Sequence, residues 1–192
     1  MQLISKLSLS LVTVSTLVLG GCQQFTQPQT PASPMVEAEN QFHLQGKIGV
    51  RTPQQSGSAF FNWLQQQEQF DIELSGILGV GKTQISGQPG QVTLNSAKTG
   101  TIQAATAEEL LQRATGWQAP ISHIIDWVQA RPATTQAKVA YDGQRRPTQF
   151  LEDGWTVDLS YNEQARLPNR LILKQTFESG QENRITMVIQ NR

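Results

Sequence analysis

Cysteine is almost absent from this chain. Its single cysteine, Cys22, lies close to the N-terminus, so no internal disulfide can form. An excess of charge of one sign is absent too, because 15 lysines and arginines balance 15 aspartates and glutamates. A balanced charge gives no sign of an electrostatic nucleic-acid binder. The composition therefore excludes a disulfide-linked domain and disfavours a nucleic-acid partner.

Groupings typical of catalytic and metal sites are also missing. His43 and His123 are far apart and have no cysteine or carboxylate cluster at ligand spacing, so we expect surface or locally bonded side chains. No nucleophile-elbow or Cys/His pattern occurs. The carboxylate pairs at 108–109 and 152–153 are expected at ordinary solvated or capping positions, at a helix start and at a turn. We therefore predict no metal site, no catalytic residue and no enzyme activity.

One stretch does match a chemical motif. Residues 76–83 read GILGVGKT, which fits the P-loop pattern G-x-x-x-x-G-K-[ST]. A working P-loop needs a helix directly after its lysine, so that backbone N–H groups and the helix dipole converge on phosphate. Here the alternation of a strand continues after Lys82, and Gly87, Pro89 and Gly90 stand where a second helical turn would be. The sequence therefore predicts a strand at 82–86 and no nucleotide binding.

The first 22 residues have the order of an export signal. One early cation, Lys6, precedes an uncharged apolar run at 7–19 and two glycines. The run is short for a membrane span, although a plain signal peptide or a single anchor helix stays open. Residues 19–22, LGGC, resemble the bacterial lipobox, in which cleavage leaves an acylated cysteine at the N-terminus. This resemblance implies a signal peptide at 1–21 and N-acyl and S-diacylglycerol lipid on Cys22, with no other cofactor expected.

The residues after Cys22 bear on location and linkage. In lipobox proteins an Asp after the cysteine suggests retention in the inner membrane; Gln23 stands here instead. This implies a lipid anchor in the outer membrane of a Gram-negative bacterium, facing the periplasm. Residues 23–40 are rich in Gln, Pro, Thr and Ser and bury too little apolar surface to fold. We predict the lipidated cysteine and a flexible tether at 22–40, followed by one folded domain at 41–192.

Alternation of apolar and polar residues dominates the predicted domain. Such a period of two predicts β-strands with one apolar and one wet face. Ten strands are expected, at 42–50, 58–64, 69–76, 82–86, 91–96, 101–104, 148–153, 154–161, 170–177 and 184–190. Short strands joined by short turns indicate an antiparallel meander that is curled or barrel-like.

Two helical segments interrupt the strands. Thr106 and Glu109 form a capping-box pattern before an apolar run that Gly116 stops. Pro120 opens a second helix, whose apolar positions 121, 124, 125 and 128 share one face and which should end at Arg131 and Pro132. Because a sheet has one apolar face to cover, we expect these helices to form a plug or lid over it.

The connection expected between the strands at 69–76 and 82–86 is unusually apolar. It carries Ile77, Leu78 and Val80 among glycines, whereas connecting loops favour polar residues. Either the tip folds back onto a neighbour, or it is an exposed finger that contacts a membrane or a partner. One leucine that enters hydrocarbon gains about 1.5–3 kcal/mol, which suffices for a reversible contact but not for an anchor.

Several short patterns, taken in order, resemble the LolB family within the LolA/LolB-like carrier superfamily. They are FHLQGKIGVR at 42–51, SAFFNW at 58–63, SGILG at 75–79, AEELL at 107–111, GWQAPI at 116–121, DWV at 126–128, DGWTV at 153–157 and LPNRL at 167–171. Together they cover almost all of the chain after residue 41. One departure is Ile77, where the family loop usually has proline.

The resemblance implies a mainly β fold, a half-open antiparallel β-barrel with a short helical lid over an apolar cavity. It implies a monomeric outer-membrane receptor that accepts triacylated lipoproteins from a LolA-type periplasmic carrier and inserts them into the outer membrane without nucleotide hydrolysis. In this family a leucine matching Leu78 is implicated in the insertion step, and Ile77 and Val80 flank it here. The candidate cavity and lid residues are Phe61, Trp63, Phe70, Ile72, Leu74, Ile121, Ile124, Ile125, Trp127, Val128, Trp155, Val157 and Leu159.

Alternatives remain open for the whole chain and for single residues. A structural or scaffold lipoprotein with a filled core that binds another envelope protein would have the same strand pattern. The tryptophans Trp63, Trp117, Trp127 and Trp155 fit an ordinary core as well as an acyl cavity. The arginines at 145–146 fit a solvated turn, or contact with an acidic carrier or phosphate headgroups.

Overall fold

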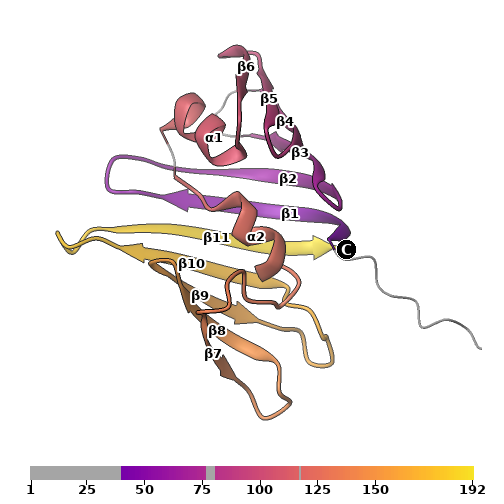
Figure 1. The fold of residues 1–192 in the computed structure, drawn as a ribbon, viewed down its shortest axis with the longest axis vertical. Coiled ribbons are helices and arrows are strands. Elements are labelled where there is room, and N and C mark those ends of the chain that lie inside the picture. The colour runs from indigo at the N-terminus through magenta and orange to yellow at the C-terminus, as the bar shows by residue number, and fades with distance from the viewer. Residues whose placement is uncertain (1–39, 77–80, 117) are drawn as a thin grey trace, which may run out of the picture. The chain divides into compact units, whose positions relative to one another are not determined.

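The described part of the chain is one continuous antiparallel sheet with two short helices. A computed structural model describes residues 40–76, 81–116 and 118–192. Eleven strands lie in the order β6-β5-β4-β3-β2-β1-β11-β10-β9-β8-β7 (Figure 1). Their bounds are β1 Gln41–Arg51, β2 Ser56–Gln66, β3 Gln69–Ser75, β4 Lys82–Gln88, β5 Gln91–Ser96, β6 Gly100–Ala104, β7 Lys138–Tyr141, β8 Pro147–Glu152, β9 Trp155–Ser160, β10 Arg170–Thr176 and β11 Glu182–Asn191.

The strand order explains why the sheet stays open. β1 pairs with β2 on one side and with β11 on the other, so the two ends of the domain meet at the centre of the sheet. Two meanders, β1–β6 and β7–β11, extend outward from this pair. Their last strands, β6 and β7, are the two edges and do not pair with each other. The prediction of a mainly β, half-open antiparallel sheet is thereby confirmed.

Glycine allows the two central strands to approach closely. A Cβ on Gly46 would lie 2.0 Å from the carbonyl oxygen of Val188 and 3.0 Å from the Phe61 ring. The register of β1 against β11 shifts at this point, between Gln45 and Gly46. Only a residue without a side chain fits here, so the glycine of the GKIGV stretch is required by packing.

The sequence predicts ten strands, and the structure adds β7, Lys138–Tyr141. This strand has four residues and lies at an edge, and its Tyr141 side chain is exposed. An edge strand with one partner needs no regular apolar face, so the alternation that marks the other strands is missing. The omission therefore has a physical cause, and it does not change the fold class.

The first helix is confirmed with its predicted capping box. α1 spans Ala107–Thr115, and the Thr106 hydroxyl accepts a hydrogen bond from the Glu109 backbone N–H at 3.1 Å. The Glu109 carboxylate in turn accepts from the backbone N–H of Ala105 at 3.2 Å. Gly116 ends the helix with φ 75°, the left-handed conformation that favours glycine.

The second helix is shorter than predicted. α2 spans Ile121–Trp127, and the chain leaves it through two tight turns, with Ala130 at φ 58°. The helix thus ends before Arg131 and Pro132 are reached. In Figure 1 both helices lie on the viewer's side of the sheet, α2 in front of β1 and β11. No helix in the described ranges is both long and apolar enough to cross a membrane.

Several predicted features lie outside the described residues. They are the signal peptide at 1–21, Cys22, the tether apart from Asn40, the loop residues Ile77, Leu78 and Val80, and Trp117. Their assignments therefore stay predictions.

Candidate functional site

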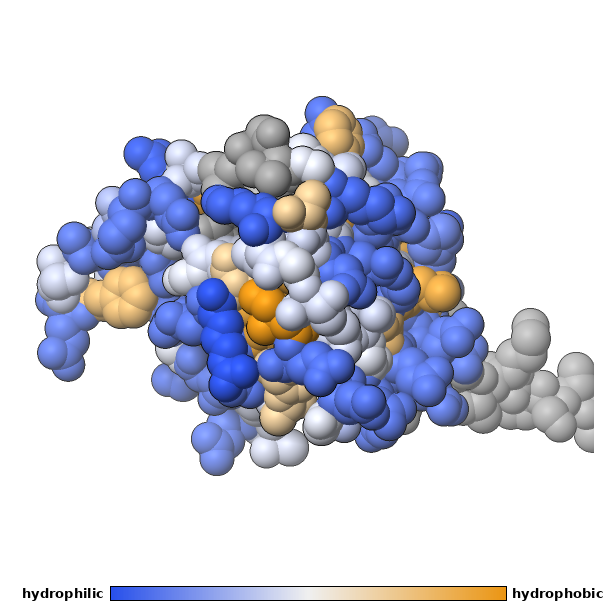
Figure 2. Space-filling view, turned by 90° about the horizontal axis from the view of Figure 1, so that it is seen from above, coloured by the Kyte–Doolittle hydropathy of each residue, from blue (hydrophilic) through white to orange (hydrophobic). Residues whose placement is uncertain are grey.

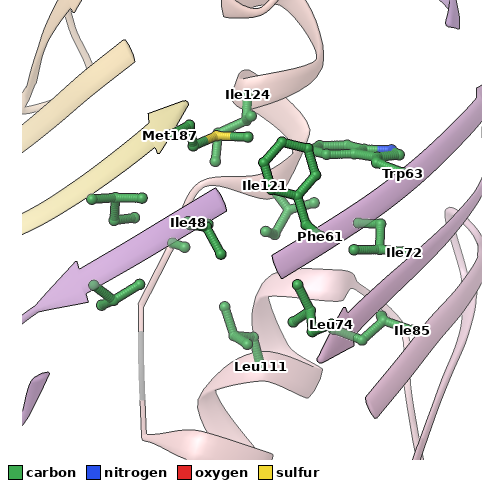
Figure 3. Close-up of a pocket in the computed structure, with 13 residues that line it drawn as sticks. Ile48, Phe61, Trp63, Ile72, Leu74, Ile85, Leu111, Ile121, Ile124 and Met187 are labelled. Carbon is green, nitrogen blue, oxygen red and sulfur yellow. The ribbon is translucent and has the colours of Figure 1, made fainter. Parts of the chain in front are cut away.

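An apolar cavity lies where both helices meet the sheet (Figure 3). Its wall comes from β1–β4 and β11 on one side and from α1, α2 and the segment between them on the other. The thirteen lining residues are all apolar: Ile48, Val50, Phe61, Trp63, Ile72, Leu74, Ile85, Leu111, Ala119, Ile121, Ile124, Ile185 and Met187.

The one polar group on this wall is satisfied within the protein. The Trp63 indole N–H donates to the Gln65 side-chain oxygen at 2.9 Å, and the Gln65 amide donates to the Gln67 carbonyl at 2.7 Å. Gln65 is 1% exposed, so this bond is made in the interior. Because no lining group is left to bind water or a polar ligand, the cavity suits hydrocarbon.

The cavity is small in the described conformation. Its volume is about 60 Å³, enough for a few water-sized groups but not for a long acyl chain. Seen from the β6 end, the surface is mostly hydrophilic, with small separate hydrophobic patches (Figure 2). A long fatty chain therefore needs a larger space than the cavity has in this conformation.

Six of the candidate cavity residues line this space. They are Phe61, Trp63, Ile72, Leu74, Ile121 and Ile124. Five others are buried elsewhere in the same hydrophobic core: Trp127, Val128, Trp155, Val157 and Leu159. Phe70 and Ile125 are half-buried and pack against that core. The structure therefore gathers the candidates in one core but brings only the first group to the cavity.

Seven lining residues are not among the sequence-derived candidates. They are Ile48, Val50, Ile85, Leu111, Ala119, Ile185 and Met187. The strand alternation already separates four of them from their polar neighbours, since Ile48 and Val50, and Ile185 and Met187, are spaced by two in β1 and β11. The missing information is strand order, because only the β1–β11 pairing brings both strands beneath α2.

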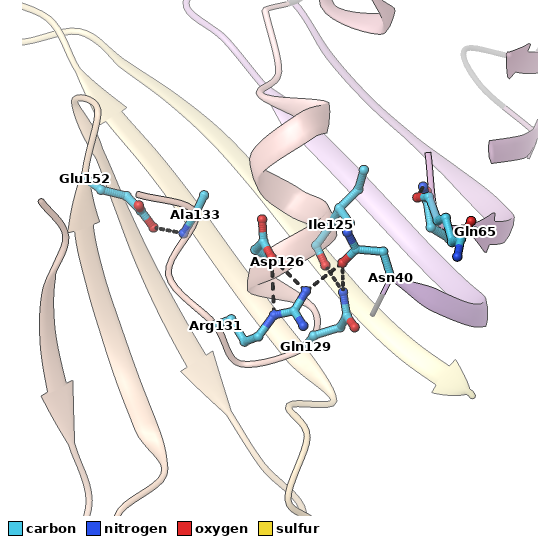
Figure 4. A network of polar contacts seen from close by, with 9 residues as sticks. Asn40, Gln65, Ile125, Asp126, Gln129, Arg131, Ala133 and Glu152 are labelled. Carbon is cyan, nitrogen blue, oxygen red and sulfur yellow. Dashed lines mark hydrogen bonds and ion pairs between the residues drawn. The ribbon is translucent and has the colours of Figure 1, made fainter. Parts of the chain in front are cut away.

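A buried carboxylate fixes α2 to the second half of the sheet. Glu152, at the end of β8, is only 6% exposed. It accepts hydrogen bonds from the Trp127 indole N–H at 2.5 Å and from the backbone N–H groups of Ala133 at 3.1 Å and Thr134 at 2.7 Å. Figure 4 shows the bond to Ala133. The expectation that both carboxylates at 152–153 are solvated or capping is therefore wrong for Glu152, whose three donors lie far away in sequence.

The C-terminal end of α2 is tied to the start of β1 (Figure 4). Arg131 contacts the Asp126 carboxylate at 2.8 Å and donates to the Asn40 side-chain oxygen at 2.6 Å. Gln129 also donates to Asn40, at 3.1 Å. In addition, Arg192 donates to the Val128 carbonyl at 2.8 Å, where a cation is favourable beside the unpaired carbonyls of a helix end. Burial lowers the pKa of Arg192, opposed by Tyr161.

The N-terminal end of α2 has fewer contacts. Glu108 of α1 accepts a hydrogen bond from the Ser122 backbone N–H at 2.7 Å, so one helix caps the next. His123 lies 2.7 Å from the Asp153 carboxylate and packs edge-on against Trp127. His43 lies 2.6 Å from the Asn62 side-chain oxygen, so both histidines are locally bonded as predicted. The described residues contain no group of three or more potential metal ligands.

Two further expectations can be compared with the structure. Lys82 begins strand β4 and contacts Glu73 of β3 at 2.5 Å, so no helix follows the P-loop-like stretch. Arg146 is half-buried; it pairs with Asp142 at 2.8 Å and donates to the Ala165 carbonyl at 3.0 Å. Arg146 therefore has a structural role in the β7–β8 turn, whereas its neighbour Arg145 is exposed there.

Known proteins with similar sequences give the family. The profile of the family described as "Outer membrane lipoprotein LolB" matches residues 40–191. An outer-membrane lipoprotein LolB of Pseudomonas savastanoi pv. phaseolicola is 42% identical over 154 residues, 78% of this chain and 73% of its own. That of Pseudomonas fluorescens is 37% identical over 187 residues, 90% of this chain and 89% of its own. Among solved structures, a LolA superfamily protein of Nitrosomonas europaea covers 80% of this chain and 88% of its own, with a TM-score of 0.47 and 13% identity. The chain belongs to the LolB family of outer-membrane lipoproteins.

Proposed function

We propose that this protein is a lipid-anchored receptor that takes lipoproteins from a LolA-type carrier and inserts them into the outer membrane. The anchor is acylated Cys22, and the domain faces the periplasm. The observation that supports the proposal is the wholly apolar cavity between the helices α1 and α2 and an open sheet. The cargo is a triacylated protein whose fatty chains cannot cross water unprotected.

The driving force needs no chemical fuel. Each CH₂ exposed to water costs about 0.8 kcal/mol, so a fatty chain moves from one apolar site to another only when water is excluded between them. A receptor must bind more tightly than the carrier and less tightly than the bilayer. Each step is then downhill, and no nucleotide or catalytic residue takes part.

The contacts of α2 indicate how the cavity could enlarge. Its C-terminal end is held by Arg131, Asn40 and Arg192. Its N-terminal end has two exposed contacts, the hydrogen bond from the Ser122 backbone N–H to Glu108 and the His123–Asp153 pair. Ile121 and Ala119 of this less restrained end line the cavity. We infer that α2 pivots about its C-terminal end, and that an acyl chain occupies the space that Ile121 leaves. Binding then favours the open state because only that state offers the chain a site.

Release into the membrane is assigned to the apolar connection between β3 and β4. Its residues Ile77, Leu78 and Val80 would enter the periplasmic leaflet of the outer membrane transiently while the acyl anchor holds the protein in place. A Leu78→Glu variant should then still accept cargo from the carrier but deliver it poorly. Normal delivery of lipoproteins to membranes by that variant would remove Leu78 from the mechanism.

The direct test mixes a cargo-loaded carrier with this protein and follows the cargo by pull-down. Transfer of the lipoprotein without added nucleotide is the expected result. An Ile124→Asn variant provides the matched comparison, because Ile124 is 1% exposed and lines the cavity. Wild-type transfer by a folded Ile124→Asn variant would contradict the cavity as the acyl site.

The small volume of the cavity favours a second candidate, a scaffold lipoprotein whose core is nearly full. In that case the β-domain would bind another envelope protein and would hold no fatty chain. A solvatochromic acyl probe separates the two candidates. Saturable binding of one probe per protein supports the receptor, and a folded protein that binds none supports the scaffold.

A further inference from the structure

The face of the sheet opposite the helices carries a row of three aligned cations. Arg51 of β1 lies directly across from Arg184 of β11, and Arg184 lies directly across from Lys174 of β10. Their neighbours Val50, Ile185 and Leu173 are buried on the helix side, so the cations point the other way. Figure 1 looks onto the helix side, and this row is on the far face.

A second pair of cations extends the same face. Lys47 of β1 and Arg170 of β10 both lie across from Val188 of β11, one on each side. The Lys47 ammonium lies 4.8 Å above the ring of Phe60, its cross-strand partner in β2. Phe60 is 53% exposed. We call Lys47, Arg51, Arg170, Lys174 and Arg184, together with Phe60, the basic face.

Two carboxylates lie close to the basic face and do not neutralise it. Asp158 of β9 pairs with Lys174 at 2.9 Å, and Glu182 is exposed two residues before Arg184. Desolvation raises the pKa of Asp158, but hydrogen bonds from Gln149 and Lys174 and the charges of Lys174 and Arg184 outweigh it and lower the pKa. Five cations face these two acids, which leaves an excess of three positive charges. Glu73 of β3, diagonal to Phe60 on the same face, is paired with Lys82 and adds no net charge.

Like charges directly opposite each other in neighbouring strands destabilise a sheet. The chain as a whole has no excess of positive charge, so this row is not the result of a basic composition. An anionic surface brought against the row would remove the repulsion. Lysine or arginine together with an apolar side chain such as phenylalanine is also a combination found on protein surfaces that lie in the membrane interface.

We propose that the basic face binds anionic phospholipid headgroups and orients the domain on the membrane to which it is anchored. The proposal takes from the proposed function only the membrane anchor, and it is independent of acyl transport. A membrane is favoured over an acidic protein because the anchor keeps lipid at high local concentration. The cation row also lies at the end of the sheet where the β1–β2, β3–β4 and β10–β11 connections leave it.

The test compares two triple variants in the full chain carrying Cys22→Ala, which cannot be acylated. The first is Lys47→Gln/Arg51→Gln/Arg184→Gln. The control, Lys98→Gln/Arg145→Gln/Arg166→Gln, removes the same charge from exposed positions elsewhere. Binding is measured by co-sedimentation with vesicles of phosphatidylcholine alone and of an equal mixture with phosphatidylglycerol. The ratio of the partition coefficients for anionic and neutral vesicles isolates the electrostatic contribution to membrane binding.

Each Lys or Arg near an anionic surface raises the partition coefficient about fivefold. In the first variant the ratio should therefore fall on the order of 100-fold, and in the control variant it should change little. Salt should abolish the difference. The first variant should also unfold at the same or higher urea concentration, since a repulsion is removed. Equal losses in both variants, or no preference for anionic vesicles, would overturn the proposal. Loss of carrier binding with vesicle binding unchanged would also overturn it and assign the face to an acidic protein. Probe binding in the cavity reports separately on the proposed function.

Discussion

Replacement of Glu152 by alanine should destabilise the domain more than any change at an exposed acid. The carboxylate accepts from one indole and two backbone N–H groups, and it is 6% exposed. Alanine leaves these donors without an acceptor and opens a gap where the side chain was. The indole of Trp127 is fully buried, so water cannot replace the lost bond.

The magnitude follows from the cost of unsatisfied groups. Each buried donor left alone costs about 1–3 kcal/mol, and the backbone groups of Ala133 and Thr134 are half-buried and count less. We expect a loss of about 3–5 kcal/mol in the free energy of unfolding, within the range for breaking a buried charged network. For a domain of this size that lowers Tm by roughly 10 °C. A Glu152→Gln variant should lose about half as much free energy of unfolding. Its amide oxygen can still accept the hydrogen bond from Trp127, but its amide N–H₂ faces a backbone N–H, which is also a donor.

The assay is urea unfolding followed by tryptophan fluorescence and by far-UV circular dichroism. Glu178→Ala is the matched control, since Glu178 is exposed in the β10–β11 turn and should change the free energy by less than 0.5 kcal/mol, as is usual for surface positions. A loss below about 1 kcal/mol in Glu152→Ala would show that the donors find other partners. The reasoning that Glu152 holds α2 against the sheet would then be refuted.

Three further predictions concern the sheet and the cavity. Gly46→Ala should cost about 3 kcal/mol or more in urea unfolding, because its Cβ would overlap the Val188 carbonyl oxygen; a loss below about 1 kcal/mol would contradict the close β1–β11 approach. Ala119→Leu should fill the cavity and weaken acyl-probe binding at least tenfold with the fold retained, and unchanged affinity would place the chain elsewhere. The pKa of Asp158 is lowered in the folded state. Its ionised carboxylate therefore makes its full contribution to the free energy of unfolding above about pH 4, and this contribution is lost as the pH falls through the folded-state pKa. The urea midpoints of wild type and Asp158→Asn should therefore differ at neutral pH and converge in acid; a constant difference would argue against this pair.

Much of the fold follows from local patterns in the sequence. Strands such as β3 and β9 alternate cleanly because one face is buried and the other is wet, and the caps of α1 are set by Thr106, Glu109 and Gly116. β7 escapes prediction because an edge strand needs no such face. The end of α2 is placed too late because a left-handed Ala130, not the proline after it, turns the chain.

The candidate site is predictable only in part, since it depends on which strands are neighbours. Trp155, Val157 and Leu159 have the same alternation as Phe61 and Trp63, yet β9 lies in the half of the sheet away from the cavity. Nothing local distinguishes Glu152, which is buried by donors that approach from the segment after α2. The basic face likewise arises from strand register, because Arg51, Lys174 and Arg184 are far apart along the chain.

The central claim is that a fatty chain can lie between α2 and the sheet, against Trp63. A brominated acyl chain quenches the fluorescence of a tryptophan that it contacts, so titration of the protein with such a chain measures this placement directly. The account predicts saturable quenching by one chain per protein, and a Trp63→Phe variant that still binds the chain but has lost that quenching. Absence of quenching in the wild type, or equal quenching in Trp63→Phe, would contradict it.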